Sequence, residues 1–134
     1  MNKPLNVIRL AVAVVDRDSS YLVTQRLETA IFPGLWEFPG GRIRDGESLE
    51  DALKRTLEAR LGVLPEVGET ISSKRHAYAD YEVTLTMVQC EIGTQQPQPK
   101  AVKDFRWVPV SELDALDWVP ADLASMKRLV QDLD

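Results

Sequence analysis

Apolar residues in the first third of the chain alternate in a way that predicts β-strands. The segment Leu5–Val15 is apolar at both odd and even positions, which is typical of a central strand covered on both sides. A short polar turn separates it from Tyr21–Gln25, where the alternation has the period of two expected for a second strand. Arg26–Gly34 is predicted to be a loop. The apolar run Leu35–Phe38 follows, and we expect Pro39-Gly40-Gly41 to break regular structure after it.

The strongest helix signal begins at Ser48, a favourable N-cap residue. Asp51 lies three positions later, as in a capping box, and Gly62 is placed to close the helix. Between these ends, one face of the helix is apolar and the other carries charges spaced as i,i+4 pairs. The apolar face has Leu49, Leu53 and Leu57, and the charged face has Glu50, Lys54 and Glu58. The pattern predicts an amphipathic helix packed on a sheet.

The second half of the chain returns to strand patterns and ends on a helical one. A turn is predicted at Ala79-Asp80, an alternating strand at Tyr81–Met87 and a last short strand at Phe105–Val110. Ser111-Glu112-Leu113 resembles a helix start, and apolar residues recur at helical spacing in the last segment, at Leu123, Met126, Leu129, Val130 and Leu133. Strands interleaved with helices predict one α/β domain over 1–134, with a mixed sheet packed by helices.

Composition narrows the class of protein further. The 134 residues are 44% hydrophobic and 28% charged, which suits one globular domain, and no apolar run reaches the ~18–20 residues of a membrane span. Arg9 and Asp16 within the first apolar stretch argue against a signal peptide. Cys90 is the only cysteine, so an intrachain disulfide is excluded and a cytoplasmic location is expected. The net charge of −5 disfavours duplex nucleic acid as a partner.

A glycine pair followed by a carboxylate and a helix is typical of sites for phosphates and metal ions, because glycine lets the backbone approach a ligand closely. Gly34-Leu-Trp-Glu-Phe-Pro-Gly-Gly41, followed at fixed spacing by Glu47, Arg55 and Gly62-Val63, resembles the Nudix box. The resemblance covers nearly the whole chain and is closest to MutT-like nucleoside triphosphate pyrophosphohydrolases; it includes Val12–Arg26, Phe105–Pro109 and Trp118–Asp122. It implies an α/β/α sandwich that converts a nucleoside triphosphate to the monophosphate and pyrophosphate with Mg²⁺.

The departures from that family concern the metal. Three helix glutamates hold Mg²⁺ in the family, and Thr56, Ala59 and Arg60 stand in their places here. A further carboxylate of the family aligns with Ala101, with Asp104 three residues away. Glu50 and Glu58 lie on the outer helix face and are not expected to substitute. Because a hard dication needs oxygen ligands, we expect Mg²⁺ as a cofactor only if the protein is catalytically active.

The remaining candidate residues each have a binding and a structural interpretation. Glu47 is a residual catalytic group and weak metal ligand, or a charge at the helix N-terminus paired with Arg55 or Arg60. Arg60 is an ordinary ion-paired arginine, or a cationic fork that holds a phosphate in place of the metal. The resemblance implies that Asp122 reads a nucleobase edge, although it could simply cap the last helix. Arg26 matches a family position near the ligand, or is a surface arginine.

Three functions therefore stay open. The favoured one is a degenerate Nudix domain that binds a nucleotide or related phosphorylated ligand with weak or no hydrolysis. Its expected ligand-binding residues are Arg26, Gly40, Gly41, Arg60 and Asp122. The second is an active, Mg²⁺-dependent nucleoside triphosphate pyrophosphohydrolase that depends on Glu47. The third is a non-catalytic protein-interaction scaffold. A homodimer is compatible with all three, and neither a membrane nor duplex nucleic acid is expected as a partner.

Overall fold

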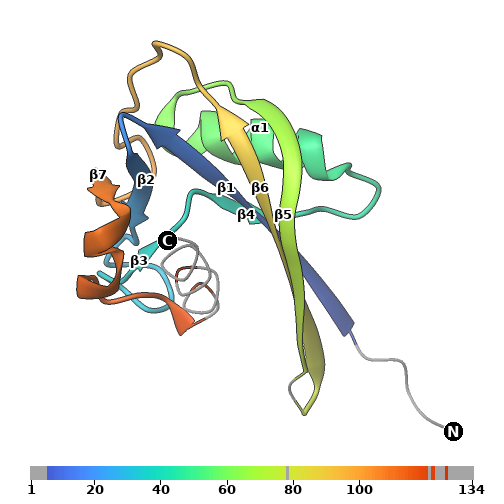
Figure 1. The fold of residues 1–134 in the computed structure, drawn as a ribbon. Helices are drawn as coiled ribbons and strands as arrows, with labels where there is room; N and C mark the ends of the chain where they lie inside the picture. Colours follow the sequence, from blue (N-terminus) through green and yellow to red (C-terminus); the bar gives the residue numbers. More distant parts are fainter. Residues whose placement is uncertain (1–5, 78, 121, 123–125, 127–134) are drawn as a thin grey trace, which may run out of the picture.

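The computed structural model describes residues 6–77, 79–120, 122 and 126 and is built around one long strand, β1 (Asn6–Arg17) (Figure 1). β1 runs parallel to β6 (Tyr81–Glu91), and β6 pairs in turn with the antiparallel β5 (Glu66–Ala77). On its other edge, β1 pairs antiparallel with β4 (Gly40–Arg42) and, at its end, with β2 (Ser20–Gln25). The sheet is therefore mixed, as predicted.

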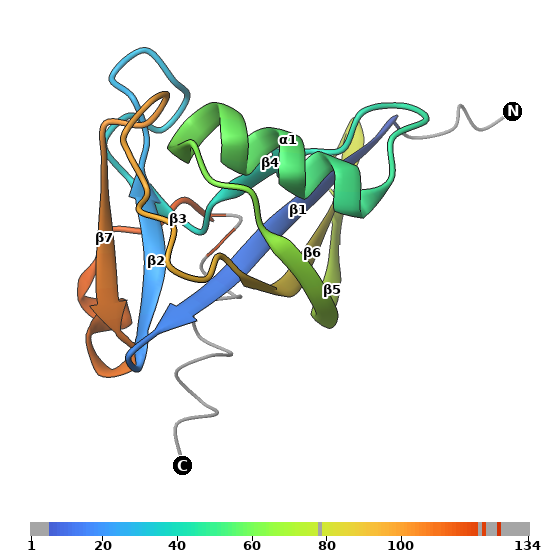
Figure 2. The same ribbon diagram turned by 90° about the horizontal axis from the view of Figure 1, so that it is seen from above.

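The remaining strands extend the sheet from β2. β2 lies between β3 (Trp36–Glu37) and β7 (Asp104–Pro109), both antiparallel to it. After β7 the chain forms a 3₁₀ helix, η1 (Val110–Ala115). Figure 2 shows β2 and β7 side by side, with the α-helix crossing over β1. Among the described residues, no helix has the length and hydrophobicity needed to cross a bilayer.

The helix α1 (Leu49–Leu61) begins and ends where the sequence predicts. The Ser48 hydroxyl accepts a hydrogen bond from the Asp51 N–H at 3.0 Å. Gly62 adopts φ +70° and its N–H donates to the Glu58 carbonyl at 3.0 Å. These contacts satisfy backbone groups that every helix end leaves unpaired. They confirm the predicted caps.

Two apolar clusters lie on opposite faces of β1, which confirms that this strand is covered on both sides. Ala11, Ala13 and Val15 pack with the apolar face of α1, whereas Val12 and Val14 belong to a second cluster. The second cluster also contains Val23 of β2 and three residues that follow β7, namely Leu113, Trp118 and Met126. The fold class is α/β, as predicted.

Two predictions about local structure need correction. The expected break after Leu35–Phe38 is present at Phe38 and Pro39, but it does not include Gly40 and Gly41, because Gly40–Arg42 is strand β4. Gly40 has φ +151°, and a Cβ there would lie 2.1 Å from the Ala11 carbonyl oxygen, so glycine permits close pairing with β1. The helix expected from Ser111 is only the 3₁₀ turn η1. Most of the predicted C-terminal helix lies outside the described residues, but Met126, which is described, is helical and buried, as predicted.

Candidate functional site

A cavity of about 330 Å³ brings the sequence-predicted ligand-binding residues together. Its lining includes Arg26, Gly40, Gly41, Arg60 and Asp122. Apolar side chains form much of the remaining wall, from Leu10, Val12, Ile31, Phe32, Leu85 and Val119. Glu47 does not line the cavity. The five predicted ligand-binding residues therefore share one cavity, and the predicted catalytic residue Glu47 lies outside its lining.

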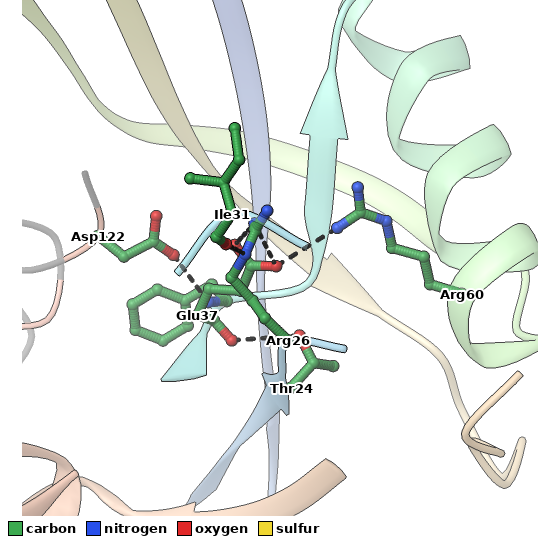
Figure 3. A network of polar contacts seen from close by, with 7 residues as sticks. Thr24, Arg26, Ile31, Glu37, Arg60 and Asp122 are labelled. Atoms are coloured by element: carbon green, nitrogen blue, oxygen red, sulfur yellow. Dashed lines mark hydrogen bonds and ion pairs between the residues drawn. The ribbon is translucent and has the colours of Figure 1, made fainter. Parts of the chain in front are cut away.

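Asp122 is held at the buried end of the cavity by the segment that precedes it. That segment is tied to β3, because the Trp36 N–H donates to the Asp117 carbonyl at 2.7 Å and the Val119 N–H donates to the Trp36 carbonyl at 2.9 Å. The Asp122 side chain accepts a hydrogen bond from the Phe38 N–H at 2.8 Å (Figure 3). Asp122 is only 3% exposed, and its burial next to Glu37 raises its pKa to about 7. A carboxyl that keeps its proton can donate a hydrogen bond as well as accept one.

Glu37 of β3 connects two arginines beside the cavity, a role that the sequence reasoning missed. Arg26 Nη1 donates to Oε1 and Oε2 of Glu37, at 3.2 and 3.0 Å, and Arg60 Nη1 donates to Oε1 at 3.4 Å (Figure 3). Two guanidinium groups and one carboxylate leave this cluster with a net positive charge, although the whole chain has −5. The sequence feature that could have indicated this role is the acidic Glu37 itself, which lies between the apolar residues Trp36 and Phe38.

Gly41 allows the helix to approach the strand at the position where the family places its metal ligands. A Cβ at Gly41 would lie 3.0 Å from Thr56 Cγ2 and 3.2 Å from Arg60 Nη2. Thr56 is buried, and its hydroxyl donates to the Ala52 carbonyl at 2.8 Å, within the helix. A methyl group and a guanidinium therefore face the glycine, where a metal site would need carboxylate oxygens.

The Glu47 carboxylate is hydrogen-bonded to Arg55 and Arg44. Its two oxygens accept hydrogen bonds from Arg55 Nε and Nη2, at 2.8 and 2.9 Å, and one of them also accepts from the Arg44 N–H at 3.0 Å. The hydrogen bond from Arg55, then that from Arg44, lowers the pKa of Glu47 to about 2. Of the alternatives open for Glu47, the ion pair to Arg55 is the one formed.

The donor set does not fit a Mg²⁺ ion of the family type. Among residues 6–77, 79–120, 122 and 126 there is no group of three or more His, Cys, Asp or Glu that could hold a metal. The three helix positions carry a threonine bonded to its own helix, an alanine and a cation, and Glu47 is paired with Arg55. A hard dication prefers several carboxylate or carbonyl oxygens, which these side chains do not supply.

A smaller cavity of about 250 Å³ adjoins the same charged cluster. It shares Arg26, Glu37 and Arg60 with the first cavity and is also lined by Ala101. Position 101 therefore faces the cluster, as its alignment with a family carboxylate implies, but presents only a methyl group. Asp104 is occupied elsewhere, because its carboxylate accepts from the Phe105 N–H at 2.8 Å.

A larger surface depression, of about 440 Å³, lies beside the charged outer face of α1. Its lining includes Lys54, Glu66 and Glu91, and none of the predicted site residues. Charges of both signs are already present there, and Lys54 lies 3.9 Å from Glu50. The 330 Å³ cavity is therefore the better candidate site, although it is smaller.

Glu47→Gln is expected to lower the melting temperature at pH 7 and to leave nucleotide affinity unchanged. A carboxylate whose pKa is depressed stabilises the fold above its unfolded pKa, and this stabilisation is lost as the pH falls through about 2. Thermal melts at pH 7 and pH 2 should therefore differ between variant and wild type only at pH 7. Glu58→Gln, on the outer helix face, is the control. A variant that melts like wild type but binds Mg²⁺ less tightly would show that Glu47 is a metal ligand.

Comparison with known proteins gives the family. The model of the NUDIX domain matches residues 10–128. The 8-oxo-dGTP diphosphatase of Escherichia coli K12 is 28% identical over 126 residues, which cover 91% of this chain and 98% of that protein. The solution structure of the E. coli ORF135 protein has a TM-score of 0.80 at 25% identity, covering 97% of this chain and 96% of that one.

A second similar structure is the NUDIX domain of Shewanella oneidensis NrtR, solved in complex with ADP ribose. Its TM-score is 0.74 at 23% identity, with 99% of this chain and 91% of that chain covered, so it supports the fold alone. The extent of the family match decides the class of protein: the chain belongs to the Nudix family. Within that family its sequence and fold are MutT-like, and its relatives are nucleoside triphosphate hydrolases.

Proposed function

We propose that this Nudix domain binds a nucleotide, or a related phosphorylated small molecule, without needing Mg²⁺ and with weak or no hydrolysis. The observation that carries the proposal is the composition of the 330 Å³ cavity. It has a buried hydrogen-bonding carboxyl, Asp122, and a cationic wall at Arg60 and Arg26. A nucleotide has the matching chemistry, because a base with polar edges is joined to an anionic phosphate.

Arg60 is the first candidate for the phosphate. Among the described residues the Arg60 side chain makes one ion pair, at 3.4 Å to Glu37, and it is 33% exposed. A guanidinium has five N–H donors in a planar fork, so most of this capacity is available to an anion. Arg26 is more fully engaged, because it contacts both oxygens of Glu37 and also the Ile31 carbonyl. We assign Arg26 a second, supporting place in phosphate binding.

Asp122 is the candidate for the base. It lies at the buried end of the cavity, where a ligand group would be shielded from water, and its raised pKa allows it to pair with a donor or an acceptor on the ring. The backbone of Gly40 and Gly41 also lines the cavity, without side chains that would fill it. The nucleotide chemistry in the names of the relatives supports this choice of ligand. We place this activity in the cytoplasm, because a free, buried cysteine is compatible with a reducing compartment.

A second function, Mg²⁺-dependent hydrolysis of a nucleoside triphosphate to monophosphate and pyrophosphate, is favoured by the relatives. Nudix hydrolases generally use a divalent metal. Hydrolysis by this chain would require Glu47 to leave Arg55 and the metal to rely on few protein carboxylates. We rank this function second because the side chains that face Gly41 offer no carboxylate oxygen.

The two functions are separated by calorimetric titration of ATP, GTP, CTP and UTP, once in EDTA and once in Mg²⁺, followed by an assay for pyrophosphate. Wild type is expected to bind in EDTA without forming product. Arg60→Ala should weaken binding by ~10–100-fold, the loss of hydrogen bonds to a charged group. Lys54→Ala, which removes the same charge from the outer face of α1, is the matched control and should have no effect.

Other outcomes of the titration are equally informative. Binding that needs Mg²⁺ and yields pyrophosphate would establish the hydrolase. Unchanged affinity in Arg60→Ala would exclude this arginine as the phosphate ligand. No binding of any nucleotide under either condition would favour the protein-interaction scaffold.

A further inference from the structure

Two large apolar side chains lie exposed at the candidate cavity. Ile31 is 74% exposed and Phe32 is 47% exposed, and both line the 330 Å³ cavity. They are neighbours in the loop between β2 and β3. Isolated exposed apolar residues are common on proteins, but an adjacent pair on the wall of a ligand cavity offers a contact surface for an apolar ligand group.

The backbone at Phe32 is unusual for such a bulky residue. Phe32 adopts φ +56°, in the left-handed region that favours glycine. The other described non-glycine residues with positive φ are Asp18 and Ser19, which form the polar turn between β1 and β2. An aromatic residue in this conformation is unfavourable for the fold itself, and such backbone strain is found preferentially at functional sites.

The loop is fastened in this conformation by Arg26. Arg26 Nε donates to the Ile31 carbonyl (Figure 3). The main-chain N–H of Arg26 donates to the Leu35 carbonyl at 2.9 Å, and its carbonyl accepts from the Gly34 N–H at 3.1 Å. The same guanidinium is bound to Glu37. The position of Ile31 and Phe32 at the cavity is therefore coupled to the charged cluster that we assign to the phosphate end.

The rest of the cavity wall offers further apolar contact surface for a ring. Its other apolar lining residues are Leu10, Val12, Phe38, Leu85 and Val119, from four separate parts of the chain. Asp122 supplies a polar group at the buried end, and Arg60 supplies a cation at the charged end. A planar heterocycle with a polar edge and a phosphate tail would satisfy all three, whereas a sugar phosphate without a ring system would leave the apolar walls unused.

We propose that Phe32 stacks on the planar ring of the bound nucleotide and makes an aromatic base a requirement for tight binding. This inference rests on the proposed function, because it assigns the base end of the same site. Ligand binding would explain why an aromatic residue occupies a position whose backbone conformation is unfavourable for it. It also makes Arg26 a positioning residue for the loop as well as a neighbour of the phosphate.

The test compares Phe32→Gly, Phe32→Tyr and wild type in EDTA, with ATP, GTP, CTP and UTP as ring-bearing probes and tripolyphosphate as the probe without a ring. Phe32→Gly is expected to weaken nucleotide binding by ~5–150-fold, the range for loss of base stacking on an aromatic side chain. Its tripolyphosphate affinity should be unchanged. Its melting temperature should stay level or rise, because glycine accepts positive φ. Phe32→Tyr should retain nucleotide affinity.

A structural role for Phe32 predicts a different set of results. Phe32→Gly would then lower the melting temperature and weaken nucleotide and tripolyphosphate binding equally, and either result overturns the inference. Leu64→Gly, which removes another exposed apolar side chain outside this cavity, is the control for unspecific effects. Unaltered nucleotide affinity in Phe32→Gly would overturn the inference and leave the proposed function standing. Failure of wild type to bind any nucleotide would overturn both.

Discussion

The triple substitution Thr56→Glu, Ala59→Glu and Arg60→Glu is expected to create Mg²⁺-dependent release of pyrophosphate from nucleoside triphosphates. It puts carboxylates back at the three helix positions where the family has them, two of which face Gly41. A metal held there stabilises charge that develops on the phosphate in the transition state, which is worth several kcal/mol. We expect turnover ~10²–10³-fold above wild type in Mg²⁺ and none in EDTA, measured as pyrophosphate released.

The stability of the triple variant gives a second readout that does not depend on activity. Thr56 is only 4% exposed, so a glutamate there buries negative charge next to two others, and the variant should melt below wild type in EDTA. Mg²⁺ should raise its melting temperature, because a metal that binds only the folded state stabilises it. Wild type should show no such shift. The measurement is thermal melting in EDTA and at increasing Mg²⁺.

The matched control carries glutamine at the same three positions. It has nearly the same size and shape as the glutamate variant without the charges, so it should gain neither turnover nor a Mg²⁺-dependent melting shift. A glutamate variant that folds but behaves like the glutamine variant would show that these helix positions do not present a common metal site in this chain. The absence of glutamates at these positions would then not account for the weak or absent hydrolysis that we propose.

The sequence predicted correctly those elements that are determined by residues close together along the chain. The caps of α1 depend on Ser48 and Gly62, and both were assigned from residue type and spacing. The coverage of β1 on two faces follows from its own apolar run. β4 could not be predicted in this way. By residue type alone Gly40 indicates a break in regular structure, and its pairing with β1 depends on the Ala11 carbonyl, 29 positions away along the chain.

The candidate site shows the same division. Arg60 and Asp122 were singled out because the family resemblance fixes their positions, and the fold brings them to one cavity. Glu37 was missed because its role depends on two arginines that lie 11 and 23 residues away in the sequence. Phe32 was missed for a different reason. Its backbone angle and its exposure on the cavity wall are properties of the folded loop, which residue type does not reveal.

Asp122→Asn is expected to remove a large pH-dependent cost to the stability of the fold. Burial, with a smaller contribution from Glu37, raises the pKa of Asp122 from 3.8 to about 7. Below pH 3.8 the carboxyl is protonated in both states and carries no cost. As the pH rises from 3.8 to about 7, the unfolded chain ionises while the folded one keeps its proton, so the free energy of unfolding falls, by on the order of 4 kcal/mol in total.

Asparagine stays neutral at every pH and can still accept the hydrogen bond from the Phe38 N–H. Denaturant unfolding at pH 4 and pH 8 should therefore show little difference between Asp122→Asn and wild type at pH 4 and a much more stable variant at pH 8. Asp114→Asn, at an exposed position, is the control and should leave the pH dependence unchanged. Glu37→Gln separates the two causes, because it should lower the pKa of Asp122 only in part if burial dominates. Parallel pH dependences for wild type and Asp122→Asn would mean that this carboxyl ionises freely inside the folded protein, and its place at the base end of the cavity would then be that of a fixed anion.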